Sequence, residues 1–167
     1  MAPMAQRGVP WAAFVDERPD LAQAGRDLLY QFGVGLGFLA TVRRVGGPRV
    51  HPVCPILDQD QLYLLLIPSP KRDDLLRDKR FALHSFPTDD NEDAFSVTGT
   101  AEPVDDPAAR GAVIARFLEE RPTLRIDRDD LDAQLLFACR LDRCLLTRTD
   151  GHGDPRPRHE TWRSSGV

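Results

Sequence analysis

Apolar residues near the start of the chain recur at the spacing of an amphipathic helix. Over residues 16–32 the apolar side chains are separated by three or four positions, as on one face of a helix. Three spaced glycines then end the pattern. We therefore expect one helix here. Its apolar positions are Leu21, Ala24, Leu28, Leu29 and Phe32.

The segments that follow have the composition of β-strands. Residues 38–45 and 49–57 flank a Gly-Gly pair, which is typical of a tight hairpin turn between two such runs. A second turn at residues 58–60 leads into the apolar run of residues 62–67. This part of the chain is therefore predicted to be a three-stranded antiparallel meander.

Short strands and turn-rich loops continue through the second half of the chain. Many short strands at even spacing predict a closed or nearly closed antiparallel barrel, and two helices would cover its ends. The expected fold class is mainly β, in a single domain over residues 1–167 with a core at residues 16–149 and a short extension at 150–167. The later strands are expected at 81–86, 94–104, 134–147 and 159–163, the two later helices at 69–78 and 105–121, and a loop at 122–130.

The overall composition is that of an ordinary globular protein, with 41% hydrophobic and 29% charged residues in a chain of 167. The net charge of -4 argues against general nucleic-acid binding, which usually needs a basic face. No apolar run approaches the roughly 20 residues of a membrane span. The first ten residues also lack the basic-then-apolar order of a signal peptide. We thus expect a cytoplasmic protein with no nucleic-acid or membrane partner.

The cysteine and histidine positions do not predict a metal site or a disulfide framework. The three cysteines form no C-x-x-C pair, and an odd number leaves one unpaired. Cys139 and Cys144 lie five apart on one predicted strand, which places them on opposite faces and argues against shared ligation. His152 and His159 flank a loop without cysteines or carboxylates at ligand spacing.

A candidate anion site lies where the apolar run of residues 62–67 ends. Pro68 breaks the strand, and Ser69, Pro70 and Lys71 are residue types that favour the start of a helix. A helix N-terminus carries unpaired N–H groups and partial positive charge, so it attracts phosphate. The hydroxyl of Ser69 and the ammonium of Lys71 would add two donors. The same residues also fit an ordinary capped helix with solvated charges.

Four short segments follow one another in a recognisable order along the predicted barrel. They are residues 39–43 (LATVR), 47–53 (GPRVHPV), 69–71 (SPK) with 74–75 (DL), and 95–99 (FSVTG). No single segment is specific, but their order and spacing together are. On these segments, and over about residues 21–149 as a whole, the chain resembles the FMN-binding split-barrel family related to pyridoxamine 5'-phosphate oxidase.

The resemblance implies an antiparallel split β-barrel that binds FMN at a homodimer interface. It places the strand over residues 51–53 beside the flavin ring and residues 67–71 at the ring edge, ribityl chain and phosphate. Lys71 matches the family's phosphate-binding lysine, and Trp162 would either stack on the flavin or cover an apolar edge. The residues expected to bind the cofactor are His51, Pro52, Val53, Ile67, Pro68, Ser69, Lys71 and Trp162.

The activity implied by the resemblance is hydride transfer from a small soluble substrate to the flavin. Such chemistry needs no strong acid or base from the protein, so the catalytic residues stay open. In the vitamin B6 oxidase itself, an Arg-Gln pair precedes the V-x-x-G strand motif, and here Asp93 and Ala94 stand at those places. An acid there should repel a substrate phosphate. We therefore expect a relative with a different, unidentified substrate.

Two further classes fit the same fold. Some split barrels bind the deazaflavin F420, whose longer acidic tail calls for a basic groove. A non-catalytic flavin-binding or haem-binding module is the other class, and haem would need one of the two loop histidines as an axial ligand. The arginines that could form the basic groove are Arg43, Arg44, Arg49 and Arg72.

Overall fold

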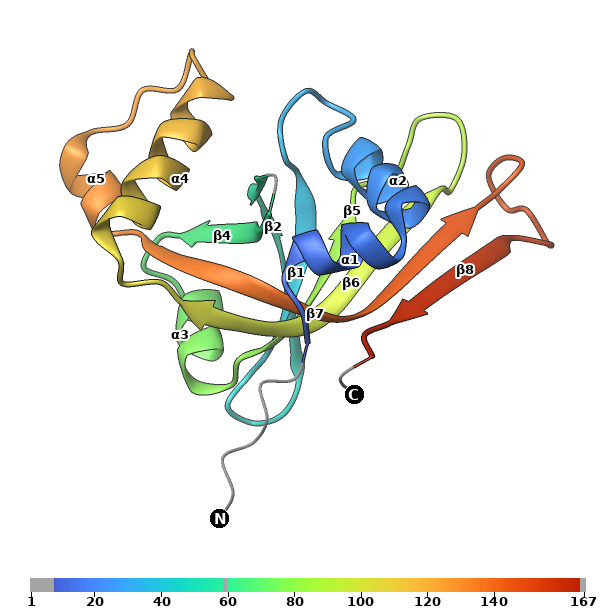
Figure 1. The fold of residues 1–167 in the computed structure, drawn as a ribbon, viewed down its shortest axis with the longest axis horizontal. Coiled ribbons are helices and arrows are strands. Elements are labelled where there is room, and N and C mark those ends of the chain that lie inside the picture. Colours follow the sequence, from blue (N-terminus) through green and yellow to red (C-terminus); the bar gives the residue numbers. More distant parts are fainter. Residues whose placement is uncertain (1–7, 59, 166–167) are drawn as a thin grey trace.

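The computed structural model describes residues 8–58 and 60–165. These residues form an eight-stranded antiparallel sheet with helices packed against it (Figure 1), which confirms the predicted mainly β fold class. The strands are β1 (Gly37–Val42), β2 (Pro48–Val53), β3 (Pro55–Leu57), β4 (Leu62–Leu66), β5 (Arg80–Ser85), β6 (Ala94–Pro103), β7 (Leu135–Arg148) and β8 (Arg158–Arg163). The helices are α1 (Trp11–Glu17), α2 (Pro19–Leu29), α3 (Pro70–Arg77), α4 (Pro107–Glu119) and α5 (Arg128–Asp132).

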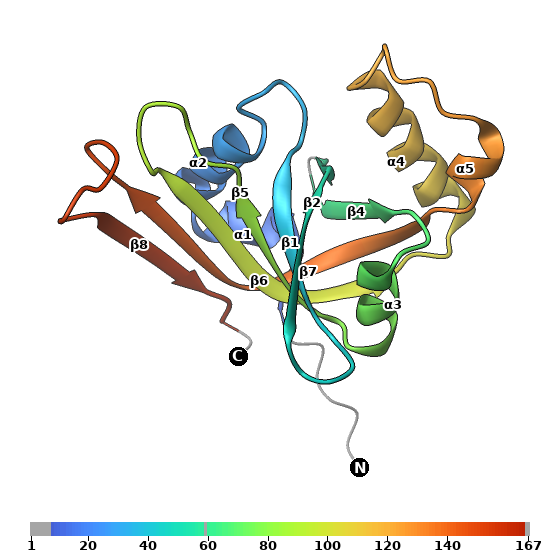
Figure 2. The ribbon, with the colours of Figure 1, turned by 180° about the vertical axis from the view of Figure 1, so that it is seen from behind.

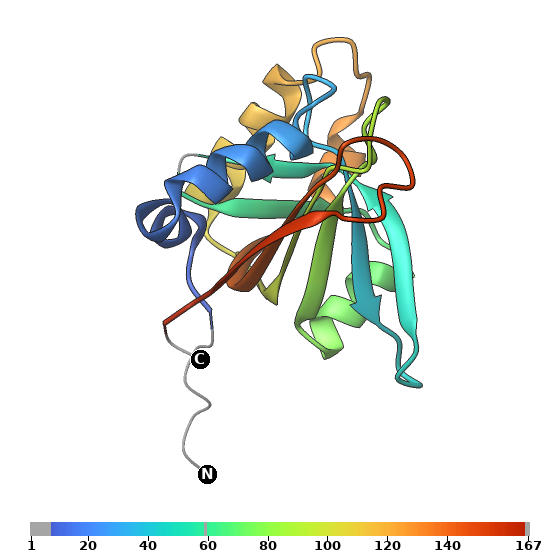
Figure 3. The same ribbon diagram turned by 90° about the vertical axis from the view of Figure 1, so that its right-hand side faces the viewer.

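The order of the strands brings two neighbours in sequence to opposite edges of the sheet. The order is β2-β1-β5-β6-β7-β4-β3, with β8 beside β7, and only Cys54 separates β2 from β3. The sheet must therefore curl until its two edges meet, and Figure 3 shows this curl from the side. The predicted meander is wrong, because residues 49–57 form two strands that pair with different partners.

The first predicted helix is two helices that meet at Arg18. Pro19 suits the first position of α2, but it cannot continue α1 because it lacks an N–H group and its ring clashes with the preceding turn. α1 begins earlier than the predicted bound of residue 16 and carries Trp11 and Phe14, which are fully buried. The hydrophobic core therefore extends beyond residues 16–149 of the expected core.

A β-bulge shifts the pairing of β6 and β7. Thr98 pairs with Arg143 but Gly99 pairs with Leu141, so Asp142 is an extra residue on β7. Cys139 and Cys144 are therefore both buried on the core side, and the expectation that they occupy opposite faces is wrong. Burial raises the pKa of the Cys139 thiol and raises that of Cys144 to about 12. Neither thiol is an accessible nucleophile near neutral pH.

α4 covers the β3 and β4 edge of the sheet. The carboxylate of Asp106 accepts a hydrogen bond from the Ala109 N–H at 2.8 Å and begins the helix. Val113 on α4 then packs in a second apolar cluster with Ile56, Leu65 and Leu136. α5 falls partly within the loop predicted at residues 122–130. Of the described helices, none is long and apolar enough to cross a bilayer.

The bulge predicts a strict requirement for glycine at position 99. A Cβ atom added to Gly99 would lie 1.8 Å from the Arg140 carbonyl oxygen, a backbone atom that cannot move aside alone. We expect Gly99→Ala to lower the free energy of unfolding by about 2 kcal/mol or more, measured by urea denaturation.

Gly111→Ala is the matched control, because nothing lies within 4 Å of the added atom on α4. It should be neutral or stabilising by up to about 1 kcal/mol. Equal effects of the two changes would contradict this account of the bulge.

Candidate functional site

A buried carboxylate joins α3 to the β1–β2 hairpin. The Asp74 side chain, only 5% exposed, accepts hydrogen bonds from Arg49 Nε at 2.7 Å, from the Thr41 hydroxyl at 2.9 Å and from Arg77 Nη1 at 3.2 Å. Burial alone would raise the pKa of Asp74, but the hydrogen bonds from Arg49, Thr41 and Arg77 outweigh it and hold the pKa below its ordinary value. We refer to these four residues as the Asp74 anchor.

The anchor sets the direction of α3 relative to β2. Arg77, in the last turn of α3, also donates to the Val42 carbonyl at the hairpin end of β1. α3 therefore runs toward the hairpin, and its first turn lies on the other side of the anchor, where β2 continues to His51. Lys71 precedes Asp74 by three positions, so the two side chains share one face of the helix. Figure 2 shows α3 and β4 on the same side of β2.

The first turn of α3 has unpaired hydrogen-bond donors. Ser69 occupies the N-cap position as predicted, but its hydroxyl donates to the Ile67 carbonyl at 2.9 Å and does not cap the helix. The backbone N–H groups of Lys71 and Arg72 have no acceptor among the described residues. The Lys71 ammonium likewise has no ion pair or hydrogen bond within the described chain. Two backbone donors and one cation are therefore available to an anion here.

Arg72 adds a further cation at the same turn. Its Nη1 donates to the Ala133 carbonyl at 2.9 Å, which connects α3 to the start of β7. Its Nε is buried and has no partner within the described residues. A buried unpaired N–H is costly, so this group also favours a bound acceptor at the start of α3.

The β2 side of the site is open at the sheet edge. His51 pairs with Leu39 and Arg49 with Thr41, so His51 and Arg49 share the face that the anchor uses. His51 and Pro52 are exposed, whereas Val53 is buried. At the end of β4, Ile67 is 53% exposed and Pro68 is exposed as well. These apolar and backbone surfaces can accept a planar ring. The Arg49–Asp74 pair joins β2 to the helix that carries Lys71, and we call the space between β2 and the β4–α3 segment the split.

Trp162 does not join this group. It is 6% exposed, its ring lies 4.7 Å from that of Phe14, and its Nε1 donates to Glu17 at 2.7 Å. Trp162 pairs with Cys144 in the second half of β7, whereas α3 meets Ala133 before the start of that strand. Cys144 is separated from Leu135, the first residue of β7, by roughly 30 Å along the strand at about 3.3 Å per residue. The structure therefore favours the second reading of Trp162, in which it covers an apolar edge.

The Asp93 carboxylate is hydrogen-bonded within the protein. Its carboxylate accepts hydrogen bonds from Arg148 Nη1 and from the Thr149 N–H, both at 2.8 Å. Burial raises the pKa of Asp93, but the hydrogen bonds from Arg148 and Thr149 outweigh it and leave the pKa lowered. Because Arg148 compensates its charge, repulsion of a substrate phosphate by Asp93 is weaker than the sequence alone suggests.

The arginines named for F420 and the histidines named for haem differ in whether they are free to bind a ligand. Arg49 pairs with Asp74, which leaves Arg72 at the start of α3 and Arg43 and Arg44, exposed at the β1–β2 turn, for a basic groove. His152 Nε2 donates a hydrogen bond to the Asp89 carbonyl at 3.0 Å, and His159 Nδ1 shares a hydrogen bond with the Thr147 hydroxyl at 3.0 Å. Within the described ranges, no three or more His, Cys, Asp or Glu residues are grouped to hold a metal ion.

An apolar surface covers the outer face of β2 and β1 and reaches Ala82 on β5. Val50 on β2 pairs with Ala40 on β1, which in turn pairs with Ala82 on β5. Pro52 on β2 pairs with Phe38 on β1. These side chains point away from the core because the alternate positions of each strand are buried. Val50 is 59% exposed. The outer face thus offers an unpartnered apolar patch beside the strand that carries His51.

Sequence reasoning missed the anchor although it quoted Thr41, Arg49 and Asp74 within the matching segments. The available signal was the spacing of Lys71, Asp74 and Arg77, which places all three on one helix face. The partners on β1 and β2 could not be found from spacing, because they depend on where the sheet packs against α3.

Comparisons with known proteins support the fold. No family model and no curated protein matches the chain in sequence. A heme binding protein from Mycobacterium smegmatis matches in structure with a TM-score of 0.65 and 20% identity, over 87% of this chain but only 59% of that one. An F420 reductase matches with a TM-score of 0.55 and 23% identity, over 65% and 87%. A Listeria innocua protein named as a candidate pyridoxamine 5'-phosphate oxidase matches with a TM-score of 0.58 and 13% identity, over 72% and 93%.

The chain thus spans less than two thirds of the heme binding protein's length and most of the other two. At these identities the likeness shows the fold alone, and that fold is the split β-barrel that the sequence resemblance implies.

The Asp74 anchor predicts a pH-dependent stability. Because the folded pKa of Asp74 is lowered, its stabilisation is complete above the unfolded value of about 3.9 and is lost as the pH falls through the folded value. We expect Asp74→Asn to lower the free energy of unfolding near pH 7 by about 2–3 kcal/mol, since it leaves two guanidinium groups without their carboxylate. The difference from the wild-type chain should shrink near pH 3.

Asp150→Asn is the control for this experiment. Asp150 pairs with Arg158 at 3.0 Å, but the Asp150 side chain is 77% exposed, so its loss should have a small effect. Urea unfolding at the two pH values measures both variants. A difference for Asp74→Asn that is equally large at low pH would contradict the assignment.

Proposed function

We propose that the protein binds FMN in the split between β2 and the β4–α3 segment and acts as a flavin-dependent oxidoreductase on a small soluble molecule. The observation that carries this proposal is the first turn of α3, where Lys71 and two backbone N–H groups have no partner among the described residues. A phosphate monoester fits such a turn, because it brings negative charge and several acceptor oxygens. The Asp74 anchor holds the turn toward β2.

The residues of this chain would have distinct roles toward the cofactor. Lys71, the Lys71 and Arg72 N–H groups and the Arg72 Nε would hold the phosphate. The backbone of β2 at residues 51–53 and the exposed Ile67 and Pro68 would face the planar ring. When bound, FMN supplies the acceptor for a hydride from the substrate, so the protein needs no strong acid or base of its own. The site residues then position the ring and exclude water.

F420 is the second candidate cofactor. The observation in its favour is the exposed pair Arg43 and Arg44 at the β1–β2 turn, together with the fold shared with an F420 reductase. The observation against it is the ion pair of Arg49 with Asp74, which removes one cation from the expected basic groove. FMN needs only the first turn of α3, so we favour it.

The role of Lys71 predicts a difference between two flavins. Replacing Lys71 by alanine removes a charge-assisted hydrogen bond to the phosphate, which contributes about 1–3 kcal/mol. We expect Lys71→Ala to weaken FMN binding by about ten-fold or more and to leave riboflavin, which has no phosphate, nearly unaffected. Fluorescence titration of both flavins measures this. Lys79→Ala is the control, since Lys79 pairs with Glu102 at 2.6 Å outside the site. Equal weakening of FMN and riboflavin by Lys71→Ala would make Lys71 a structural residue.

The apolar outer face predicts a homodimer that places the two flavin sites at its interface. We expect sedimentation at micromolar concentration to show a dimer. Val50→Asp places an unpaired charge on the outer face of β2 and should give a monomer with weaker FMN binding. Val45→Asp, at a position 90% exposed in the β1–β2 turn, should leave the dimer intact. A wild-type monomer that still binds FMN would rule out a shared site.

A further inference from the structure

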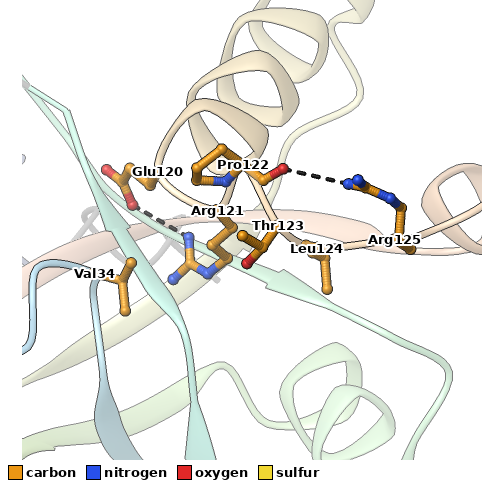
Figure 4. Close-up of a pocket in the computed structure, with 7 residues that line it drawn as sticks. All are labelled: Val34, Glu120, Arg121, Pro122, Thr123, Leu124 and Arg125. Carbon is orange, nitrogen blue, oxygen red and sulfur yellow. Dashed lines mark hydrogen bonds and ion pairs between the residues drawn. The ribbon is translucent and has the colours of Figure 1, made fainter.

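A cavity that is open to solvent lies where α4 ends, near the end of β2 that is remote from the anchor. Its volume is about 490 Å³, within the range of small-molecule sites. One wall comes from Val34 in the loop before β1, and the others come from residues 120–125 after α4 (Figure 4). The cavity adjoins the β2–β3 junction, because Arg121 Nη2 donates at 3.1 Å to Gly35, which packs directly against the Pro55 carbonyl.

Arg121 and Glu120 form one wall of this cavity, and their opposite charges compensate each other. The two side chains pair at 3.2 Å, and each is about 10% exposed. Arg121 also lies 4.3 Å over the Phe117 ring, while Glu120 accepts hydrogen bonds from Arg116 Nε at 3.0 Å and the Tyr30 hydroxyl at 3.2 Å. The hydrogen-bonding capacity of both groups is therefore largely used. Glu120 and Arg121 therefore shape the cavity, and a ligand must be recognised by the other lining residues.

Arg125 is the cation of the cavity that has no acidic partner. Its only hydrogen bond within the described chain runs from Nη1 to the Pro122 carbonyl at 3.4 Å, which leaves Nε and Nη2 free. The next acidic residue along the chain, Asp127, caps α5 through the Asp130 N–H at 2.8 Å. A guanidinium with two free N–H groups on one edge matches the two oxygens of a carboxylate.

The rest of the lining is apolar with one hydroxyl. Val34 stands on the opposite side of the cavity from Arg125 in Figure 4, and Leu124 is 39% exposed between them. Thr123 adds a hydroxyl that makes no hydrogen bond with the described residues. An apolar wall with one cation in the lining is the usual composition of a pocket that orients a small organic acid.

We propose that this cavity binds a small organic carboxylate with an apolar body, whose carboxylate pairs with Arg125 and whose body packs on Val34 and Leu124. The proposal goes beyond flavin binding and does not depend on it, since none of these residues belongs to the first turn of α3. If both proposals hold, the acid lies beyond the Val53 end of β2, the same end at which residues 51–53 face the flavin ring.

The test uses benzoate as the probe and isothermal titration calorimetry of the full chain without added flavin. We expect saturable binding of benzoate to the wild-type protein. Benzamide keeps the ring without the charge, and acetate keeps the charge without the ring, so each should bind at least ten-fold more weakly. Arg125→Gln should weaken benzoate binding at least ten-fold. Arg128→Gln is the matched control, because Arg128 is 90% exposed on α5 and pairs only distantly with Asp132 at 3.7 Å.

Each contrary result overturns a defined part of the proposal. Absence of saturable benzoate binding, or equal binding by wild type and Arg125→Gln, removes Arg125 as the ligand. Benzamide binding as tightly as benzoate would show that the cavity does not recognise the carboxylate charge. Acetate binding as tightly as benzoate would show that the apolar wall does not contribute. Arg125 is exposed, so Arg125→Gln should keep the wild-type melting temperature, which a thermal melt checks. Failure of FMN to bind in a separate titration would leave these outcomes unchanged.

Discussion

The candidate cofactor site depends on one buried carboxylate. Asp74 receives hydrogen bonds from two strands and from its own helix, so it fixes where α3 lies on the β1–β2 hairpin and which way it points. A buried ion pair adds little net stability, because the cost of desolvation offsets much of the attraction. It is highly directional, however, since any displacement leaves a charge without its partner. The anchor therefore acts mainly as a positioning device. Because of the anchor, the unpaired N–H donors at the start of α3 face β2.

The curl of the sheet supplies the other half of the arrangement. Because Cys54 alone joins the two edge strands, β2 and the β3–β4 pair must approach each other, and the end of β4 delivers Ile67 and Pro68 to the same split as His51. The strand β2 then leads from one candidate site to the other. Toward His51 it faces a cation and unpaired N–H groups, and beyond Val53 it leads to a cavity with an apolar wall and Arg125. One edge strand can in this way serve a phosphate-bearing cofactor and a separate organic acid.

Local sequence patterns predicted the elements that depend on near neighbours. The Gly-Gly hairpin, the start of α3 at Ser69 and Pro70, and the approximate extent of β5, β6 and β7 all follow from turn chemistry and alternation. Long-range features were not accessible. The bulge at Gly99 depends on β7 pairing, the division at Cys54 depends on two edges meeting, and the burial of Trp162 depends on α1. For the site, the sequence located Lys71 by its resemblance to a family, but the contacts that orient it come from strands some 25–33 residues away along the chain.

The central claim, that this split barrel selects FMN, is tested most directly by one absorption spectrum. The purified protein is equilibrated with an equimolar mixture of FMN, F420 and haemin, freed of unbound ligand on a desalting column, and examined in the visible range. The donors at the first turn of α3 predict that a flavin spectrum is retained. Retention of the deazaflavin or the haem spectrum, or of no chromophore at all, would contradict the account.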